Sequence, residues 1–218
     1  MKKFGFTLAE VLITLGIIGV VAALTAPALT KNTGQAKIGP SLAKFVNTFE
    51  VASEQLLNDR NVDKLSSEAS TSAKLGEDLA SYIIMTPYKD TFTITAPNGS
   101  GSYTPNGAKY QLKDGSIAVF EYLGNISSAR GAYKGVIGRV YYDINGNTQS
   151  GNKSGKDVFL FYIDNSGILI PAGSNADQYV FGLSSAFNGL KCNMSGTSYT
   201  AGLGCTGRIA DNAWKADY

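Results

Sequence analysis

The sequence predicts an α+β protein in which a long N-terminal helix packs against an antiparallel β-sheet. Three observations support this fold class. Apolar residues fill most of the first 30 positions, and a stretch with helical periodicity follows. From about residue 90 the pattern changes to short segments typical of strands, separated by turn residues. A helix with one apolar stripe needs a cover, which one face of a sheet can supply.

Composition narrows the function classes. The chain has 218 residues and a net charge of +2, which Lys2 and Lys3 supply. Without these two, 17 basic residues balance 17 acidic ones, so the body has no basic excess that would attract nucleic acid. Histidine is absent, which removes the commonest general base. We find no catalytic motif and predict that the protein is not an enzyme.

The apolar run from Phe6 to Leu29 carries a single charge, on Glu10. As a helix rising about 1.5 Å per residue, it could cross a hydrocarbon core of about 30 Å. Lys2 and Lys3 precede it, and the positive-inside rule therefore leaves the N-terminus in the cytoplasm. We expect a single-pass transmembrane helix with the rest of the chain outside.

An ordinary signal peptide is the alternative, with cleavage after the small residues Ala26 and Ala28. Pro27 lies inside that cleavage site, and Glu10 places a charge in the apolar region. A carboxylate in hydrocarbon costs at least about 2.5 kcal/mol on insertion scales, which a disposable signal has no reason to bear.

Residues 3–10 read KFGFTLAE. This stretch resembles the processing site of type IV prepilins and of the related pseudopilins of type II secretion. The resemblance implies that a prepilin peptidase cuts after Gly5, that Phe6 becomes the N-methylated first residue, and that Glu10 becomes mature residue five. It also implies anchoring in the bacterial inner (cytoplasmic) membrane.

The resemblance further implies assembly into a filament with copies of the chain and other pilins, on an inner-membrane platform. Glu10 of an incoming subunit would pair with the Phe6 amine of a neighbour. The alternative is that Glu10 has no such partner and its side chain only extends to the lipid headgroups at one end of a plain anchor. A type IV pilus, a secretion pseudopilus and a DNA-uptake competence filament share this N-terminus. A membrane-anchored extracytoplasmic binding domain is the alternative from another class.

This interpretation divides the chain into four parts. Residues 1–5 are the leader, 6–30 the transmembrane and assembly helix, 31–58 the amphipathic half of the helix and 59–218 a globular head. Pro27 should kink or locally melt the helix, and Gly39 with Pro40 should form a second break. The expected apolar stripe is Leu42, Phe45, Val46, Phe49, Ala52, Leu56 and Leu57.

The head should begin with a polar loop over 59–74 and a short helix over 75–85. The candidate strands are 91–95, 108–112, 116–122, 136–143, 157–163 and 167–170. Turn residues at 113–115 and 164–167 predict hairpins and therefore an antiparallel meander, one face of which packs on the helix.

Two smaller sites are predicted in the head. Cys192 and Cys205 are an even, closely spaced pair in a chain with an export-type N-terminus, which favours a disulfide over a zinc site. Asp143, Asn145 and Asn147, with Asp157 further on, resemble the start of a calcium loop without matching an EF-hand. The alternative is an Asx-rich turn that caps its own backbone.

Overall fold

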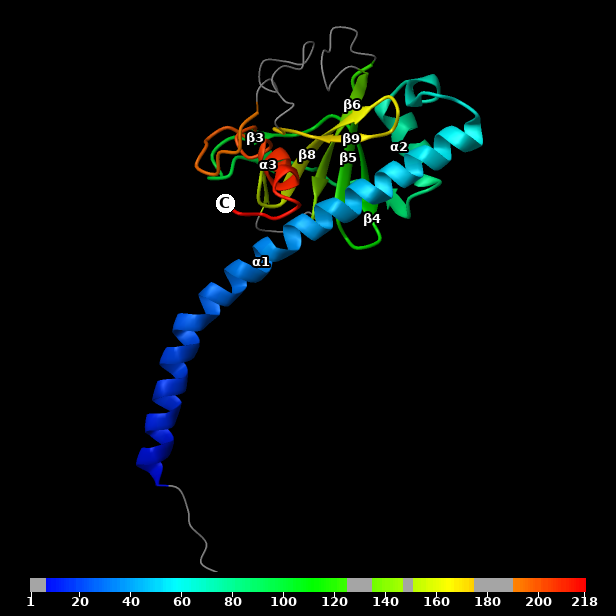
Figure 1. The fold of residues 1–218 in the computed structure, drawn as a ribbon. Helices are drawn as coiled ribbons and strands as arrows, with labels where there is room; N and C mark the ends of the chain where they lie inside the picture. The colour runs from blue at the N-terminus through cyan, green and yellow to red at the C-terminus, as the bar shows by residue number, and fades with distance from the viewer. Residues whose placement is uncertain (1–6, 125–134, 147–150, 175–189) are drawn as a thin grey trace, which may run out of the picture. The chain divides into compact units, whose positions relative to one another are not determined.

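The computed structural model describes residues 7–124, 135–146, 151–174 and 190–218, with the backbone alone for residues 25–34. The chain divides into two compact units, Met1–Lys37 and Ile38–Tyr218. Helix α1, Leu8–Arg60, contributes to both. Its first part forms the N-terminal unit and its second part belongs to the head (Figure 1).

Helix α1 corrects the predicted segmentation. It is helical from Leu8 to Arg60, so it does not end at Pro27, and the expected break at Gly39 and Pro40 is wrong. A proline in a helix interior removes one N–H donor and crowds one carbonyl, but the turns on either side can keep their hydrogen bonds. The four-part division at residues 5, 30 and 58 stays a prediction.

Gly39 does not end the helix but allows another part of the chain to pack closely against it. A Cβ atom built at this position would lie 1.6 Å from the carbonyl oxygen of Trp214. The C-terminal tail therefore crosses α1 at a position where the helix carries no side chain. The tail residues that pass over the helix, Ala213 and Trp214, both have positive φ angles, 50° and 60°. Such angles are uncommon for residues other than glycine.

The predicted apolar stripe is buried. Its buried members are Leu42, Phe45, Phe49, Ala52 and Leu56, whereas Val46 and Leu57 are partly covered; Ile38, which was not part of the prediction, is buried as well. Phe45 stacks on Tyr142 with ring centroids 4.0 Å apart, and Phe49 packs on Phe120. The second part of α1 therefore forms one side of the main hydrophobic core.

The main sheet is antiparallel throughout and has the order β1-β4-β5-β6-β8-β9. Its strands are β1 Met85–Pro87, β4 Ala108–Leu112, β5 Ile117–Tyr122, β6 Val136–Asp143, β8 Val158–Asp164 and β9 Leu169–Pro171. The predicted meander is confirmed for β4, β5, β6, β8 and β9, and two of its hairpins turn at Gly115 and Gly167, where φ is +88°. The predicted strand 91–95 is not part of it, because its strand residues Ile94–Thr95 belong to a separate small sheet. Strand β1, at the other edge, was not predicted, because its three residues include a proline.

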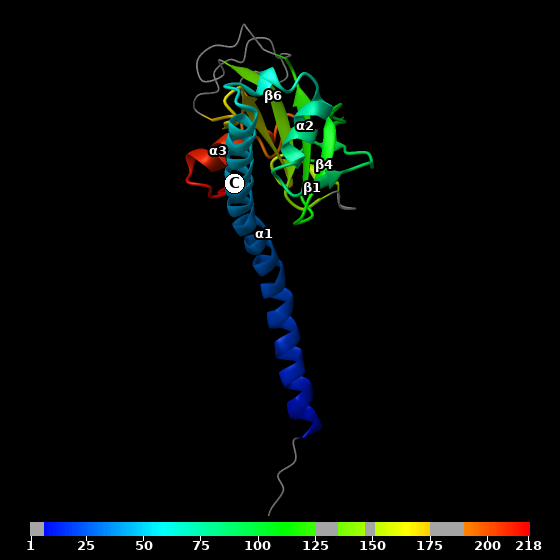
Figure 2. The ribbon, with the colours of Figure 1, turned by 90° about the vertical axis from the view of Figure 1, so that its right-hand side faces the viewer.

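Short helices complete the face of the sheet that α1 covers. These are the 3-10 helix η1, Leu65–Ser67, and helix α2, Ser72–Ala80. Residues 38–60 of α1 and helix α2 lie over the same face (Figure 2). Helix α2 begins earlier than predicted because the side chain of Thr71 accepts a hydrogen bond from the Lys74 backbone N–H and caps its first turn.

The opposite face of the sheet is also covered, which the sequence did not predict. A second core includes Ile117, Val119, Tyr141, Leu160 and Tyr162, which alternate with residues of the first core along the strands. Its cover includes a small sheet of order β3-β2-β7. The strands of this small sheet are β2 Ile94–Thr95, β3 Ser102–Tyr103 and β7 Asn152–Lys153. Helix α3, Cys205–Asp211, adds Ile209 to the first core.

In the part of the chain that the structure describes, no helix has a stretch both long enough and apolar enough to count as a membrane span.

We predict that Gly39→Ala destabilises the head by about 1–3 kcal/mol, because the new methyl group overlaps the Trp214 carbonyl. Alanine has a higher helix propensity than glycine, so the substitution would stabilise the helix if there were no clash. A loss of stability would therefore report the clash. The measurement is chemical unfolding followed by the fluorescence of the single tryptophan, whose emission should shift to the red in the variant.

Gly16→Ala is the matched control, since a Cβ atom at Gly16 meets nothing within 4 Å. Equal unfolding curves for the wild type and Gly39→Ala would contradict the assigned contact between the tail and α1.

Candidate functional site

The N-terminus of α1 is closed by Thr7 and Glu10. The Glu10 backbone N–H donates to Oγ1 of Thr7 at 3.3 Å. In return, Oε2 of Glu10 accepts hydrogen bonds from the Thr7 backbone N–H at 2.8 Å and from the Thr7 hydroxyl at 2.7 Å. This reciprocal arrangement is a capping box, which satisfies donors that the first turn of a helix leaves unpaired.

The capping box gives Glu10 a partner within its own chain. The hydrogen bonds from Thr7 go to Oε2, and among the described residues Oε1 accepts none. The carboxylate is thus held at the helix end through Oε2. Its position at the positive end of the helix dipole also favours its charged form.

The helix that follows exposes large apolar side chains on all sides. They include Leu8, Leu12, Ile13, Ile17, Ile18 and Leu24, each at least 60% exposed. Gly16 and Gly19 lie among them and have open space where a side chain would be. None of the described residues of this unit covers these side chains, so the chain needs an apolar environment or neighbouring helices here.

Gly5 and Phe6, the predicted processing residues, lie outside the described residues, and so does Asn147 of the predicted calcium loop. The side chain of Pro27 is likewise outside the description.

The other residues of the calcium loop lie close together at the end of β6. The Asn145 backbone N–H donates to Oδ1 of Asp143 at 3.2 Å, which is the Asx turn of the alternative interpretation. The Asn145 side-chain amide donates to Oδ1 of Asp157 at 3.0 Å. Among the residues that the structure describes, no three His, Cys, Asp or Glu side chains form a group that could hold a metal.

Asp143 is nevertheless unusual, because it is fully buried and its Oδ2 has no hydrogen-bond partner among the described residues. Burial raises the pKa of Asp143 to about 8, and the nearby charge of Asp157 acts in the same direction. A buried carboxyl with an unused oxygen fits either the protonated acid or a carboxylate that binds a cation.

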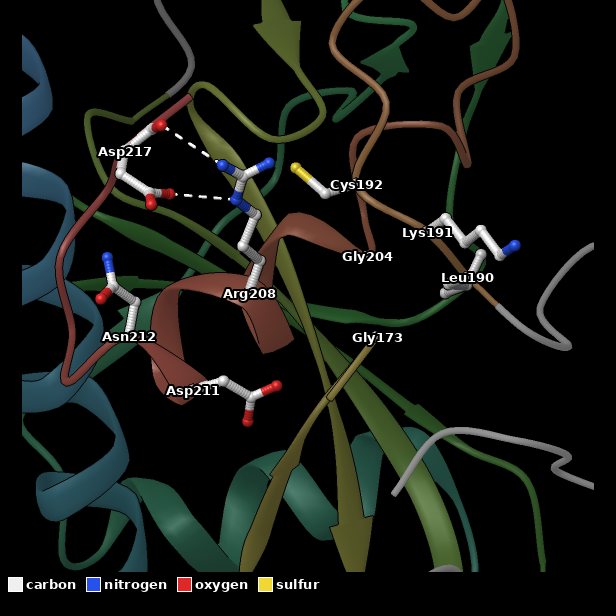
Figure 3. Close-up of a pocket in the computed structure, with 9 residues that line it drawn as sticks. All are labelled: Gly173, Leu190, Lys191, Cys192, Gly204, Arg208, Asp211, Asn212 and Asp217. Carbon is white, nitrogen blue, oxygen red and sulfur yellow. Dashed lines mark hydrogen bonds and ion pairs between the residues drawn. The ribbon is translucent and has the colours of Figure 1, made fainter. Parts of the chain in front are cut away.

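The predicted disulfide between Cys192 and Cys205 is present. Beside it lies a pocket of about 480 Å³, which Arg208 and Lys191 line together with Asp217 (Figure 3). The Arg208 guanidinium donates from Nε to Oδ1 of Asp217 at 3.0 Å. Both cysteines are bonded to each other, so the pocket offers no thiol nucleophile, and we assign it no chemistry.

Thr7 is the residue that sequence analysis missed. The signal was visible, because Thr7-Leu8-Ala9-Glu10 before an apolar run fits the capping-box pattern of Ser or Thr followed three residues later by Glu or Gln. The resemblance implies a partner for Glu10 on another subunit, whereas Thr7 binds the carboxylate on the same helix.

Comparison with known proteins agrees with the N-terminal interpretation. Residues 1–26 match the family model of the prokaryotic N-terminal methylation motif. This match is the prepilin-type signature, so the resemblance noted at residues 3–10 is confirmed. No curated protein and no solved structure matches the chain.

The buried carboxyl of Asp143 predicts a dependence of stability on pH. Its pKa is about 8 in the fold, against an ordinary 3.8. In metal-free protein, its contribution to the free energy of unfolding should be fully present below pH 3.8. It should be lost as the pH rises towards 8. Asp143→Asn should reduce this fall of the unfolding free energy with rising pH, and it should stabilise the head at pH 8 by a few kcal/mol. The measurement is urea unfolding from pH 4 to pH 8.5 with a chelator.

The exposed Asp63→Asn is the control, and it should keep the wild-type slope. Millimolar calcium at pH 8 separates the two interpretations of the loop. A gain in unfolding free energy that Asp143→Asn abolishes would indicate a calcium site, because a metal needs the deprotonated carboxylate. An unchanged curve would leave the loop as an Asx turn, and equal pH slopes for the wild type and Asp143→Asn would contradict the raised pKa.

Proposed function

We propose that this chain, whose N-terminus carries the prepilin-type signature, is the precursor of a structural subunit of a type IV pilus or a type II secretion pseudopilus. The observation that supports this most is the continuity of helix α1. It begins inside the methylation motif at residues 1–26 and continues until its buried stripe forms the core of an α+β head.

Processing is the first step of the proposal. A prepilin peptidase removes residues 1–5 after Gly5 and methylates the new amine of Phe6. The Thr7–Glu10 capping box follows that junction directly and belongs to the mature subunit, so the fixed carboxylate is retained after cleavage.

Anchoring is the second step. Residues 6–30 cross the inner membrane with the N-terminus in the cytoplasm, and the head lies outside. The exposed apolar side chains between Leu8 and Leu24 support this, because they need lipid or the helices of neighbouring subunits. The Cys192–Cys205 disulfide is consistent with a head outside the cytoplasm, where such bonds persist.

Assembly through Glu10 is the third step. The capping box uses Oε2, so Oε1 can accept the Phe6 amine of a neighbouring subunit without the loss of the helix cap. Two opposite charges about 4 Å apart attract by about 4 kcal/mol at an effective dielectric of 20. If one partner is missing, the other charge is buried without compensation, which is strongly unfavourable. Only the subunit register that pairs Glu10 with the neighbouring amine avoids this cost.

The N-terminal processing is directly testable. We predict that the mature protein isolated from cells begins at Phe6 and carries one methyl group, because the junction fits a prepilin peptidase site. Intact-mass spectrometry distinguishes this from a start at Met1 or after Ala28, and either of those starts would exclude the proposal. A bulky residue at Gly5 should leave the uncleaved precursor in the membrane, whereas Gly19→Ala should be processed normally.

Glu10 and Thr7 together test assembly. We predict that Glu10→Ala is cleaved and inserted but is almost absent from filaments, because a neighbour's Phe6 amine then has no partner. Thr7→Val should reduce incorporation less severely, since it loses the hydroxyl that orients the carboxylate but keeps the backbone N–H bond. Thr7→Ser keeps that hydroxyl and should assemble normally.

The measurement is the sheared filament fraction, with cleavage scored on the same blot. Wild-type subunits in the same cell should partly rescue Glu10→Ala, because its own Phe6 amine can still pair with a neighbour. Normal filament yield from cleaved Glu10→Ala protein would mean that the carboxylate only reaches the headgroups.

A further inference from the structure

Two uncharged segments of the head lie side by side. Residues 91–108 and residues 192–207 contain no Asp, Glu, Lys or Arg, in a chain that is 17% charged. Tyr103 of the first stacks on Tyr199 of the second, with ring centroids 4.7 Å apart and planes inclined by 15°. A Cβ atom at Gly101 would lie 2.4 Å from the Thr197 carbonyl oxygen, so the two backbones are also in contact (Figure 1).

The two segments also repeat a sequence. Residues 98–104 read NGSGSYT, and residues 193–200 read NMSGTSYT. Both copies begin with the same turn. Oδ1 of Asn98 accepts from the Ser100 backbone N–H at 3.0 Å, and Oδ1 of Asn193 accepts from the Ser195 backbone N–H at 3.1 Å. The same set of groups is therefore presented twice on adjacent parts of the surface.

Both segments are held rigidly from beneath. The Tyr103 phenol donates to the buried carboxylate of Glu121 at 3.2 Å, and the Asn106 backbone N–H donates to the same oxygen at 2.9 Å. Glu121 is itself paired with the buried Arg139. The disulfide between Cys192 and Cys205 closes the second segment. Ordered groups lose little entropy when a ligand binds, which favours recognition.

The outer face of this pair presents hydroxyl and amide groups. Its exposed side chains are those of Asn98, Ser100, Ser102, Thr104, Asn193, Ser195, Thr197 and Ser198. Among the described residues, none of the large apolar side chains classed as exposed comes from either segment. We call this face the Asn/Ser/Thr/Tyr surface.

The chemistry of this surface excludes some partner classes. Nucleic acid and anionic lipid headgroups require Lys or Arg, which both segments lack. Protein interfaces have apolar, aromatic cores in which serine is depleted, whereas here serine and threonine are exposed and the tyrosines only partly so. Hydroxyls and amides that both donate and accept hydrogen bonds suit a neutral ligand rich in hydroxyl groups.

We infer that the Asn/Ser/Thr/Tyr surface binds a neutral polysaccharide. The repeated motif suits a polymer with repeating units, because neighbouring sugars can meet equivalent groups on residues 98–104 and 193–200. The partly exposed Tyr199 adds an aromatic ring, which offers a sugar an apolar contact. The inference does not depend on the proposed filament function, since both segments belong to the head alone.

The test uses the full-length protein in a zwitterionic detergent without a sugar headgroup. Sedimentation with cellulose, chitin and insoluble starch measures binding to neutral polysaccharides. We expect retention on at least one of them, and no gel shift with duplex DNA. Ser102→Lys, which covers the exposed face with a long side chain, should weaken retention about tenfold or more. The exposed Ser67→Lys, on the 3-10 helix η1, is the matched control and should bind as the wild type does.

Tyr199→Ala should also weaken binding, whereas Tyr199→Phe keeps the ring and should retain most of it. Three results would overturn the inference: no retention on any of the three polysaccharides, equal retention of the wild type and Ser102→Lys, or binding of the wild type to DNA but not to polysaccharide. If Tyr199→Ala does not fold, Ser102→Lys still decides the question, because its side chain is exposed.

Discussion

The head depends on the contact between the aromatic stripe of α1 and the sheet. Phe45 lies flat on Tyr142, and Phe49 packs on Phe120. Burial of a side chain of this size contributes about 1.5–3 kcal/mol, and its replacement by alanine in a core costs about 3–5 kcal/mol. Residues 38–60 of α1 supply six buried side chains of this core, those of Ile38, Leu42, Phe45, Phe49, Ala52 and Leu56.

The same helix therefore has to satisfy two different requirements. In the head it needs one apolar stripe, and between Leu8 and Leu24 it is apolar on every side. A helix that is apolar all round requires lipid or other helices, whereas a helix with one stripe requires a sheet. A filament subunit that begins in a membrane and ends in a helical bundle would meet both requirements with one continuous element.

Glu10 and Asp143 show two ways in which the fold treats a carboxylate. Glu10 is fixed at a helix N-terminus by Thr7, where backbone N–H groups and the helix dipole favour its charge. Asp143 is buried with one oxygen unused, so its neutral form or a bound cation is favoured. The first arrangement can serve assembly, and the second makes the stability of the head sensitive to pH.

The sequence by itself determined the elements whose signals are local. Charge, glycine and apolar pattern around residues 3–10 identified the methylation motif, and strand-type segments between turn residues identified β4, β5, β6, β8 and β9 within a residue or two. The stripe of α1 was predicted because helical spacing and apolar character coincide over several turns. The Cys192–Cys205 bond followed from the number and closeness of the cysteines in a chain with an export-type N-terminus.

Only the tertiary structure decided features that depend on contacts between distant residues. Gly39 looked like a helix break, but the carbonyl of Trp214 explains the missing side chain. The second face of the sheet is covered by strands of two residues. The sequence predicted a strand at 91–95, but only the fold places β2 in a separate sheet with β3 and β7. Likewise, residues 98–104 and 193–200 lie far apart in the sequence, and only the fold stacks Tyr103 on Tyr199 to make one surface of them.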